Sequence, residues 1–418
     1  MLYRIFEKIN YKIFKKLSFY ELIVFFFPLI IITGPAIINF VLILCALLFV
    51  KELLIKKINF KLINTKWFYF YIFFIFYNIF NSFFSTDQNN ALRASVGQLR
   101  FFFFALFIMY FIKNVKNLDI MIKFWFLLIL LVTIDILIQN YFGQNIIRMP
   151  MPAGGRPSSF FGKEVIAGGY LAYMSIPVFF YFIQKLSTIN LANKLFYFFL
   201  YFLILLAITL TGERLSLLIF LGSTVVLSVL NFNIKKIFIL FSFLLSFFFL
   251  IYNTNNIFKS RVNDMSNILS NIHDSSWGRL WESGYMLFKS NFYFGVGLKN
   301  YRVDCDYQVD PRPQHPAQFC STHPHNFVLE ILSETGFVGF VIFSLFFVLL
   351  IIQLSQIYKK FKKQNLLFQL CLGNILILFI YVWPIKTSGS FFTTVNASYF
   401  WFNLGLALFC MKFFSIKK

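Results

Sequence analysis

The feature that most constrains the fold of this chain is a series of apolar stretches, each long enough to cross a lipid bilayer. A membrane-spanning helix needs about 17 to 25 mostly apolar residues, and inside a bilayer it satisfies its own backbone hydrogen bonds. The stretches predict an all-α membrane protein with about twelve transmembrane helices. They lie near residues 18–33, 36–53, 67–85, 96–113, 118–141, 165–184, 195–211, 214–232, 236–254, 326–357, 366–385 and 394–414.

Composition supports this class. Hydrophobic residues make up 59% of the 418 residues, charged residues make up 13%, and the mean hydropathy is +0.74, values that exclude an ordinary soluble domain. A net charge of +22 would suggest nucleic acid as the partner of a soluble chain. In a membrane protein the same charge indicates lysines on the cytoplasmic side, in contact with anionic lipid. We therefore expect membrane lipids and no nucleic acid as partners.

Lysine positions predict the orientation. They gather in alternate connections, for example at Lys56 and Lys57 and in the cluster from Lys359 to Lys363, and they continue at both ends of the chain. The positive-inside rule makes these connections cytoplasmic, with both termini on that side. The first apolar run has no small-residue cleavage site and is expected to remain as a span. The predicted layout is helices one to nine in 1–254, a long, partly helical periplasmic loop in 255–325, and helices ten to twelve in 326–418.

Nearly all the arginines fall on the opposite, outer face. Because the positive-inside rule treats lysine and arginine alike, topology alone does not explain this separation. The planar guanidinium fork suits bidentate binding of phosphate, so the outer face is predicted to hold an anionic ligand. The alternative is that these side chains anchor helix ends at the interface. The outer arginines are Arg93, Arg100, Arg148, Arg156, Arg214, Arg261, Arg279, Arg302 and Arg312.

One outer stretch, "STHPHNFVLEILSETGFVG" at 321–339, is far more polar than a span requires. We expect His325 and Asn326 in the first turn of the tenth span, where the helix N-terminus keeps an imidazole neutral and able to act as a base. Gly336 lies about three turns further on the same face, with Gly339 nearly in line. These glycines predict a groove for a lipid chain or another helix. The alternative is an interfacial histidine above a helix-packing glycine pair.

Three other outer segments carry an arginine. "TGERLSLL" at 211–218 places Arg214 at the start of the eighth span. An amphipathic stretch at 277–301 carries Arg279 near its start and reads "WGRLWESGYMLFKSNFYFGVGLKNY". "GGRPSSFFGKE" at 154–164 carries Arg156.

Taken in order, these segments resemble the O-antigen ligase family of membrane glycosyltransferases. The family signature is similar to a pattern in this chain, in which His325-Asn326 is followed after nine residues by Gly336 and after two more by Gly339. A block of the family's periplasmic loop is similar to "GRLW…FGVGLKNY". "TGERLS" resembles the arginine-bearing turn of the family, and the predicted twelve-span layout is also that of the family. Members usually carry Ser before this arginine and a small residue after it, whereas this chain has Glu213 and Leu215.

The resemblance implies an inverting glycosyltransferase that needs no metal or cofactor. It would move a glycan, the O-antigen, from undecaprenyl diphosphate to a hydroxyl of lipid A core at the periplasmic face of the bacterial inner membrane. Arg214 and Arg279 would hold the diphosphate, and His325 would take the proton from the acceptor hydroxyl. We further expect substrate-binding roles for Arg156, His323, Asn326, Gly336 and Gly339.

The acceptor remains open in the sequence. A polysaccharide polymerase and a protein O-oligosaccharyltransferase of the same family would share the donor and the signature. The chain shows no large extra C-terminal domain, which favours the lipid-core ligase. A flippase or other transporter would need polar residues along a path at the midplane, whereas the polar groups here gather at the outer ends of the spans.

For the remaining polar residues of the outer face, a structural role is favoured over a metal-binding or catalytic role. Asp304, Asp306 and Asp310 fit a solvated loop better than a metal site, and the outer histidines lack the spacing of a helical zinc site. Cys305 and Cys320 lie in an oxidising compartment and could pair. Asp135, in the outer part of the fifth span, has either a structural or a functional partner.

Overall fold

The computed structural model describes most of the chain and divides it into two compact units, each described by itself here. Unit 1 comprises Met1–Gly34, Ile112–Ser270 and Lys362–Leu376, and unit 2 comprises Pro35–Phe111, Asn271–Phe361 and Ile377–Lys418. The described part consists of helices and loops with one isolated bridge between Gln144 and Pro150. The described residues are 17–55, 58, 64–152, 154–187, 189–272, 275–308, 320–360, 366–387 and 389–416.

The predicted all-helical class is confirmed over these residues, and seven helices are long and apolar enough to cross a membrane. Five further helices coincide with the other predicted spans, and that all twelve cross the bilayer stays a prediction. The seven are α4 (Pro35–Leu54), α6 (Gln88–Phe111), α7 (Val115–Phe142), α9 (Leu191–Thr211), α10 (Arg214–Asn231), α11 (Ile234–Thr254) and α16 (Phe327–Lys360). The five are α3 (Phe19–Ile32), α5 (Lys66–Ser82), α8 (Ala167–Ile183), α17 (Leu366–Val382) and α18 (Thr394–Ile416).

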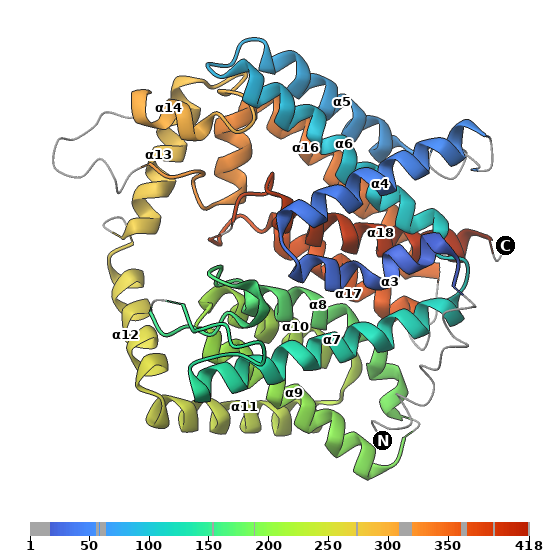
Figure 1. Ribbon diagram of the computed structural model, residues 1–418, viewed down its shortest axis with the longest axis vertical. Coiled ribbons are helices and arrows are strands. Elements are labelled where there is room, and N and C mark those ends of the chain that lie inside the picture. The colour runs from blue at the N-terminus through green and yellow to red at the C-terminus, as the bar shows by residue number, and fades with distance from the viewer. Residues whose placement is uncertain are drawn as a thin grey trace. The chain divides into compact units, whose positions relative to one another are not determined.

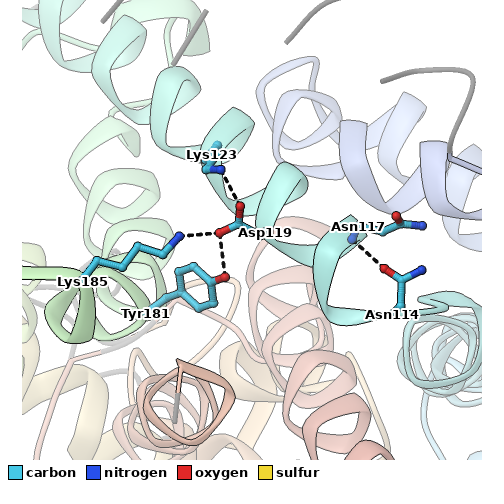
Figure 2. Close-up of polar contacts among 6 residues, drawn as sticks. All are labelled: Asn114, Asn117, Asp119, Lys123, Tyr181 and Lys185. Carbon is cyan, nitrogen blue, oxygen red and sulfur yellow. Dashed lines mark hydrogen bonds and ion pairs between the residues drawn. The ribbon is translucent and has the colours of Figure 1, made fainter. Parts of the chain in front are cut away.

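In unit 1, a group of charged side chains ties α7 to the end of α8 at the predicted cytoplasmic side. Asp119, in the first turns of α7, forms ion pairs with Lys123 and Lys185 and accepts a hydrogen bond from the Tyr181 hydroxyl at 2.8 Å (Figure 2). The α7 helix begins close by, where the Asn114 side chain accepts from the Asn117 N–H. The carboxylate therefore pairs with two lysines, one from each helix region, and fixes where the two helices meet.

At the other end of α7, the loop that carries Arg156 is fixed by two buried side chains. Asp135 accepts hydrogen bonds from the Ile146 N–H at 2.8 Å and from the Ser159 hydroxyl at 2.6 Å. Gln139 accepts from the N–H groups of Ser158 and Ser159. The role of Asp135, which the sequence left open, is therefore to hold this loop against α7.

Unit 2 is built around aromatic packing. Helices α5, α6, α16 and α18 pack against one another, and α5, α6 and α16 can be followed side by side in Figure 1. The buried Tyr71 ring of α5 is the centre of this packing. Its centroid lies 4.9 Å from Phe102, 4.8 Å from Phe346 and 4.7 Å from Trp401. Aromatic rings at these separations bury much apolar area, and the Tyr71–Trp401 pair, with its ring planes at 62°, adds edge-to-face attraction.

The long loop predicted over 255–325 is partly helical. It holds α12 (Asn256–Ser270) in unit 1, and α13 (Ser276–Ser290) and α14 (Tyr301–Gln308) in unit 2. A small core of Leu287, Val296, Tyr301 and Cys305 joins α13 to α14, and Cys320 packs against it. Cys305 and Cys320 form a disulfide, so the pairing that the sequence allowed is present.

This disulfide should make both thiols unreactive towards a maleimide in folded, non-reduced protein, and both should label after mild reduction. A cross-link over 15 residues stabilises a fold by about 3 kcal/mol, so reduction should also lower the thermal midpoint. The buried Cys45, Cys371 and Cys410 provide the control, because they should label only after denaturation. Labelling of Cys305 and Cys320 without reductant would contradict the pairing.

Candidate functional site

The predicted site residues belong to both units. Arg156 and Arg214 lie in unit 1, and the other predicted residues lie in unit 2. We call residues 323–326 the histidine segment. We call residues 211–214, which join α9 to α10, the arginine turn.

The histidine segment precedes α16 and does not form its first turn, which corrects the sequence prediction. The helix begins at Phe327. The Asn326 carboxamide oxygen accepts from the N–H groups of Val328 and Leu329 at 3.0 and 3.1 Å, so Asn326 caps the helix. His325 lies just outside the cap with a φ of 51°, a left-handed conformation that few residues other than glycine adopt. The Asn326 amide also donates to the Pro384 carbonyl at 2.8 Å.

The His325 imidazole is neutral at neutral pH, as the sequence predicted. The ring is half-buried and lies against the His323 ring, with centroids 4.1 Å apart. Burial lowers the pKa of His325 to about 4, the charge of His323 adds to this lowering, and the charge of Glu330 opposes it. Desolvation is therefore the main cause, rather than the helix N-terminus that the sequence suggested.

Gly336 interrupts α16, so the continuous helical face expected from His325 to Gly339 is not formed. Its φ of 66° and ψ of −175° lie outside the helical region. Backbone groups on both sides of this break pair with residues 292–297. The N–H groups of Val296 and Gly297 donate to the carbonyls of Ser333 and Glu334 at 3.0 and 2.8 Å. The N–H groups of Phe337 and Val338 donate to the carbonyls of Phe292 and Tyr293 at 2.8 and 3.1 Å.

The close approach predicted at the two glycines is therefore made by the chain itself. A Cβ on Gly336 would collide with the backbone of Tyr293 and Phe294, and a Cβ on Gly339 would lie 2.8 Å from the Tyr77 ring. The groove expected at Gly336 for a lipid chain or another helix is filled by residues 292–297. Gly336 is required by this backbone contact and by its positive φ.

Two carboxylates follow the histidine segment, and both are fully buried. Glu330 accepts from the Phe391 N–H at 2.8 Å, and the charge of Lys299 acts on both Glu330 and Glu334. Lys299 itself donates to the Ser390 hydroxyl. Neither carboxylate is exposed, whereas His323 and His325 are both half-buried and remain accessible as bases of the histidine segment.

Arg279 lies in the first turn of α13, on an element that contacts the histidine segment. The Ser275 side chain caps this helix by accepting from the Gly278 N–H at 3.1 Å. Further along α13, a Cβ on Gly284 would lie 2.8 Å from the Pro324 ring, so the α13 backbone packs closely against that ring. Unit 2 thus carries Arg279 and His325 on adjoining elements.

In unit 1, three arginines from three elements meet at the arginine turn. Arg156 Nε donates to the Thr211 carbonyl at 2.9 Å, and Arg261 Nη1 donates to the Gly212 carbonyl at 2.7 Å. Arg214 begins α10 and faces Asp264 at 3.4 Å. Sequence reasoning did not place Arg261 at this turn, because a position on the predicted outer face was its only signal in the sequence.

Glu213, which departs from the usual family residue, holds the arginine turn in place. Its two carboxylate oxygens accept from the N–H groups of Gly168 and Gly169 at 2.7 and 2.9 Å and from the Ser216 hydroxyl at 2.9 Å. Burial raises the pKa of Glu213, and these hydrogen bonds and the charge of Arg156 oppose the rise. Because Gly168 and Gly169 lie in the first turn of α8, Glu213 joins that helix to α10.

No group of three or more His, Cys, Asp or Glu side chains that could hold a metal ion occurs among the residues that the structure describes. Asp310, Arg312 and His315 lie outside those residues, and the side chain of Asp306 is not described either.

A comparison with protein families matches residues 199–344 to the family described as O-antigen ligase. No curated protein matches the chain. The matched region includes the arginine turn, Arg279, the histidine segment and Gly336, and it leaves Arg156 outside. These are the segments in which the sequence resemblance was found. Residues 199–344 are therefore similar to the O-antigen ligase family.

Proposed function

We propose that the protein is a glycosyltransferase that moves an O-antigen glycan from undecaprenyl diphosphate to a hydroxyl of lipid A core. The reaction would take place at the periplasmic face of the bacterial inner membrane, with both termini cytoplasmic. The main support is a neutral, half-buried His325 just before a membrane helix, within a family match that also includes Arg214 and Arg279.

In the proposed reaction, the acceptor hydroxyl oxygen attacks the anomeric carbon of the donor sugar. The bond from that carbon to the diphosphate oxygen breaks, and undecaprenyl diphosphate leaves with the electron pair. His325 receives the hydroxyl proton. A weakly basic imidazole can do this because the hydroxyl becomes strongly acidic as the new bond forms. One in-line displacement inverts the anomeric carbon.

The arginines would stabilise the leaving group without a metal. Charge develops on the diphosphate as the glycosidic bond breaks, and fixed guanidinium groups aimed at that charge lower the barrier. Arg214 lies in unit 1 and Arg279 lies in unit 2. We assign Arg156 and His323 to substrate contact. Asn326, Gly336 and Gly339 would act by holding the segment that carries His325.

The alternatives within the family differ in the acceptor, and a deletion strain separates them. We expect core-only lipopolysaccharide together with accumulated lipid-linked polymer, because a ligase acts after polymerisation. Complementation with the intact chain should restore the ladder of long chains. Core carrying a single repeat would instead identify a polymerase. Normal lipopolysaccharide with loss of a glycoprotein would identify a protein glycosyltransferase, and either result would overturn the assignment to lipid A core.

The lowered pKa of His325 predicts the pH dependence of transfer. The neutral imidazole is the active form, and with a pKa of about 4 it is almost fully populated above pH 5. We therefore expect kcat/KM, which reports the free enzyme, to be constant from pH 8 to pH 5 and to fall as the pH approaches 4. Donor binding over the same range provides the control, because arginines do not titrate there. An acid limb near the ordinary histidine value of 6.5 would contradict this environment.

A further inference from the structure

We infer that Arg261 of α12 is a further diphosphate-binding residue of unit 1, and that Asp264, one turn later, holds Arg214 until the anion displaces it. This inference rests on the proposed function, since it assigns one more residue to the donor site. It concerns residues that the sequence did not assign to that site. Residues three apart lie on the same face of a helix, so Arg261 and Asp264 face the arginine turn together.

The first observation is the convergence of the three guanidinium groups. Arg156 and Arg261 each donate one hydrogen bond to adjacent carbonyls at the end of α9, and Arg214 follows two residues later. Each guanidinium has five N–H donors, so Arg156 and Arg261 keep most of theirs available after these backbone contacts. Three such groups around one turn offer many donors to phosphate oxygens.

The second observation is the charge balance. Burial lowers the pKa of Arg261, the charges of Arg156 and Arg214 add to this lowering, and the charge of Asp264 opposes it. Glu213 is the other acid at the turn, and its oxygens are already occupied by Gly168, Gly169 and Ser216. The three arginines thus face two acids, Glu213 and Asp264, and the oxygens of Glu213 are occupied by other donors. A ligand with two negative charges, such as a diphosphate ester, would relieve the repulsion.

The third observation is a small pocket beside the turn. It is lined by Arg261 and Gly212 together with Asn140, Gly155 and Asn255, all within unit 1. The glycines leave backbone uncovered there, and the asparagine side chains offer further donors. Gly212 has a φ of 64°, and a Cβ at this position would collide with the Arg261 guanidinium. The turn is therefore shaped to let that guanidinium approach.

Asp264 completes the inference because its ion pair is weak enough to be replaced. The Asp264 side chain is 59% exposed, and its oxygen lies 3.4 Å from Arg214 Nη2. Exposed ion pairs of this kind contribute little stability. A diphosphate presents more charge and more acceptor oxygens to the same guanidinium. Asp264 would thus compete with the donor for Arg214.

A binding experiment separates this role from a structural one. Purified full-length protein in nanodiscs is titrated with inorganic pyrophosphate, and with geranylgeranyl diphosphate as the lipid form, by calorimetry. Arg261→Gln should weaken both on the order of tenfold or more, as the loss of a charge-assisted hydrogen bond does. Asp264→Asn should tighten both several-fold, because Arg214 is released. Lys259→Ala, which removes an exposed charge from the same helix, should leave both unchanged.

The thermal midpoint of each variant shows whether it is folded. Wild-type affinity in Arg261→Gln with a lowered midpoint would make Arg261 only a cap of the α9 carbonyls and overturn the inference. Weaker binding in Asp264→Asn would overturn the competition. Binding is measured without transfer, so the two proposals fail separately. If the variants show the predicted affinities but the protein has no transferase activity, the diphosphate site is supported and the proposed function is overturned. If the protein transfers glycan but the variants bind with unchanged affinities, the proposed function is supported and the inference about Arg261 and Asp264 is overturned.

Discussion

The break at Gly336 is the constraint on which unit 2 depends. A long apolar helix cannot leave backbone groups unpaired in a bilayer, because each unpaired group costs several kcal/mol. Here the backbone groups of the opened turn pair with residues 292–297, and two side chains of α5 donate further hydrogen bonds to this region. Tyr77 donates to the Thr335 carbonyl at 2.7 Å, and Asn81 donates to the Phe294 carbonyl at 2.8 Å. The outer loop is thereby built into the helix that follows the histidine segment.

This pairing has consequences for the candidate site. Residues 292–297 follow α13, so fixing them also fixes the helix that carries Arg279. The contact between Gly284 and Pro324 and the disulfide from Cys305 to Cys320 hold the other side of the same loop. In unit 1, Glu213 has the corresponding role, because it joins α8 to α10 and so sets the arginine turn. In each unit the candidate site side chains thus lie on or next to a loop that is bound to helix ends.

The sequence predicted the local features of the fold well. The apolar stretches match the helices. His325 was recognised as a neutral histidine, but the helix start was misplaced because Asn326 caps the helix in preference to extending it. Gly336 was recognised as a point of close approach. Its partner, some 40 residues earlier, could not be identified because such pairing is decided by tertiary structure.

Arg261 could not be assigned for a similar reason. Its hydrogen bond to Gly212 joins residues 49 positions apart, and no local pattern in α12 signals that contact. The same holds for Asp135, whose partners lie in a loop whose path depends on Gln139 and Gly143. Patterns of period and spacing describe single helices. The meeting of several loops at one place depends on how those helices pack.

The central claim is that arginines bind the donor diphosphate and His325 supplies the base. Its most direct test measures lipid-linked donor binding and glycan transfer side by side, in purified His325→Ala and Arg279→Lys proteins, with Arg302→Lys as an exposed control. We predict that His325→Ala binds donor like the wild type and transfers nothing. Arg279→Lys should lose donor affinity and on the order of 100-fold in transfer, because lysine lacks the guanidinium fork. Normal transfer by His325→Ala would contradict the account.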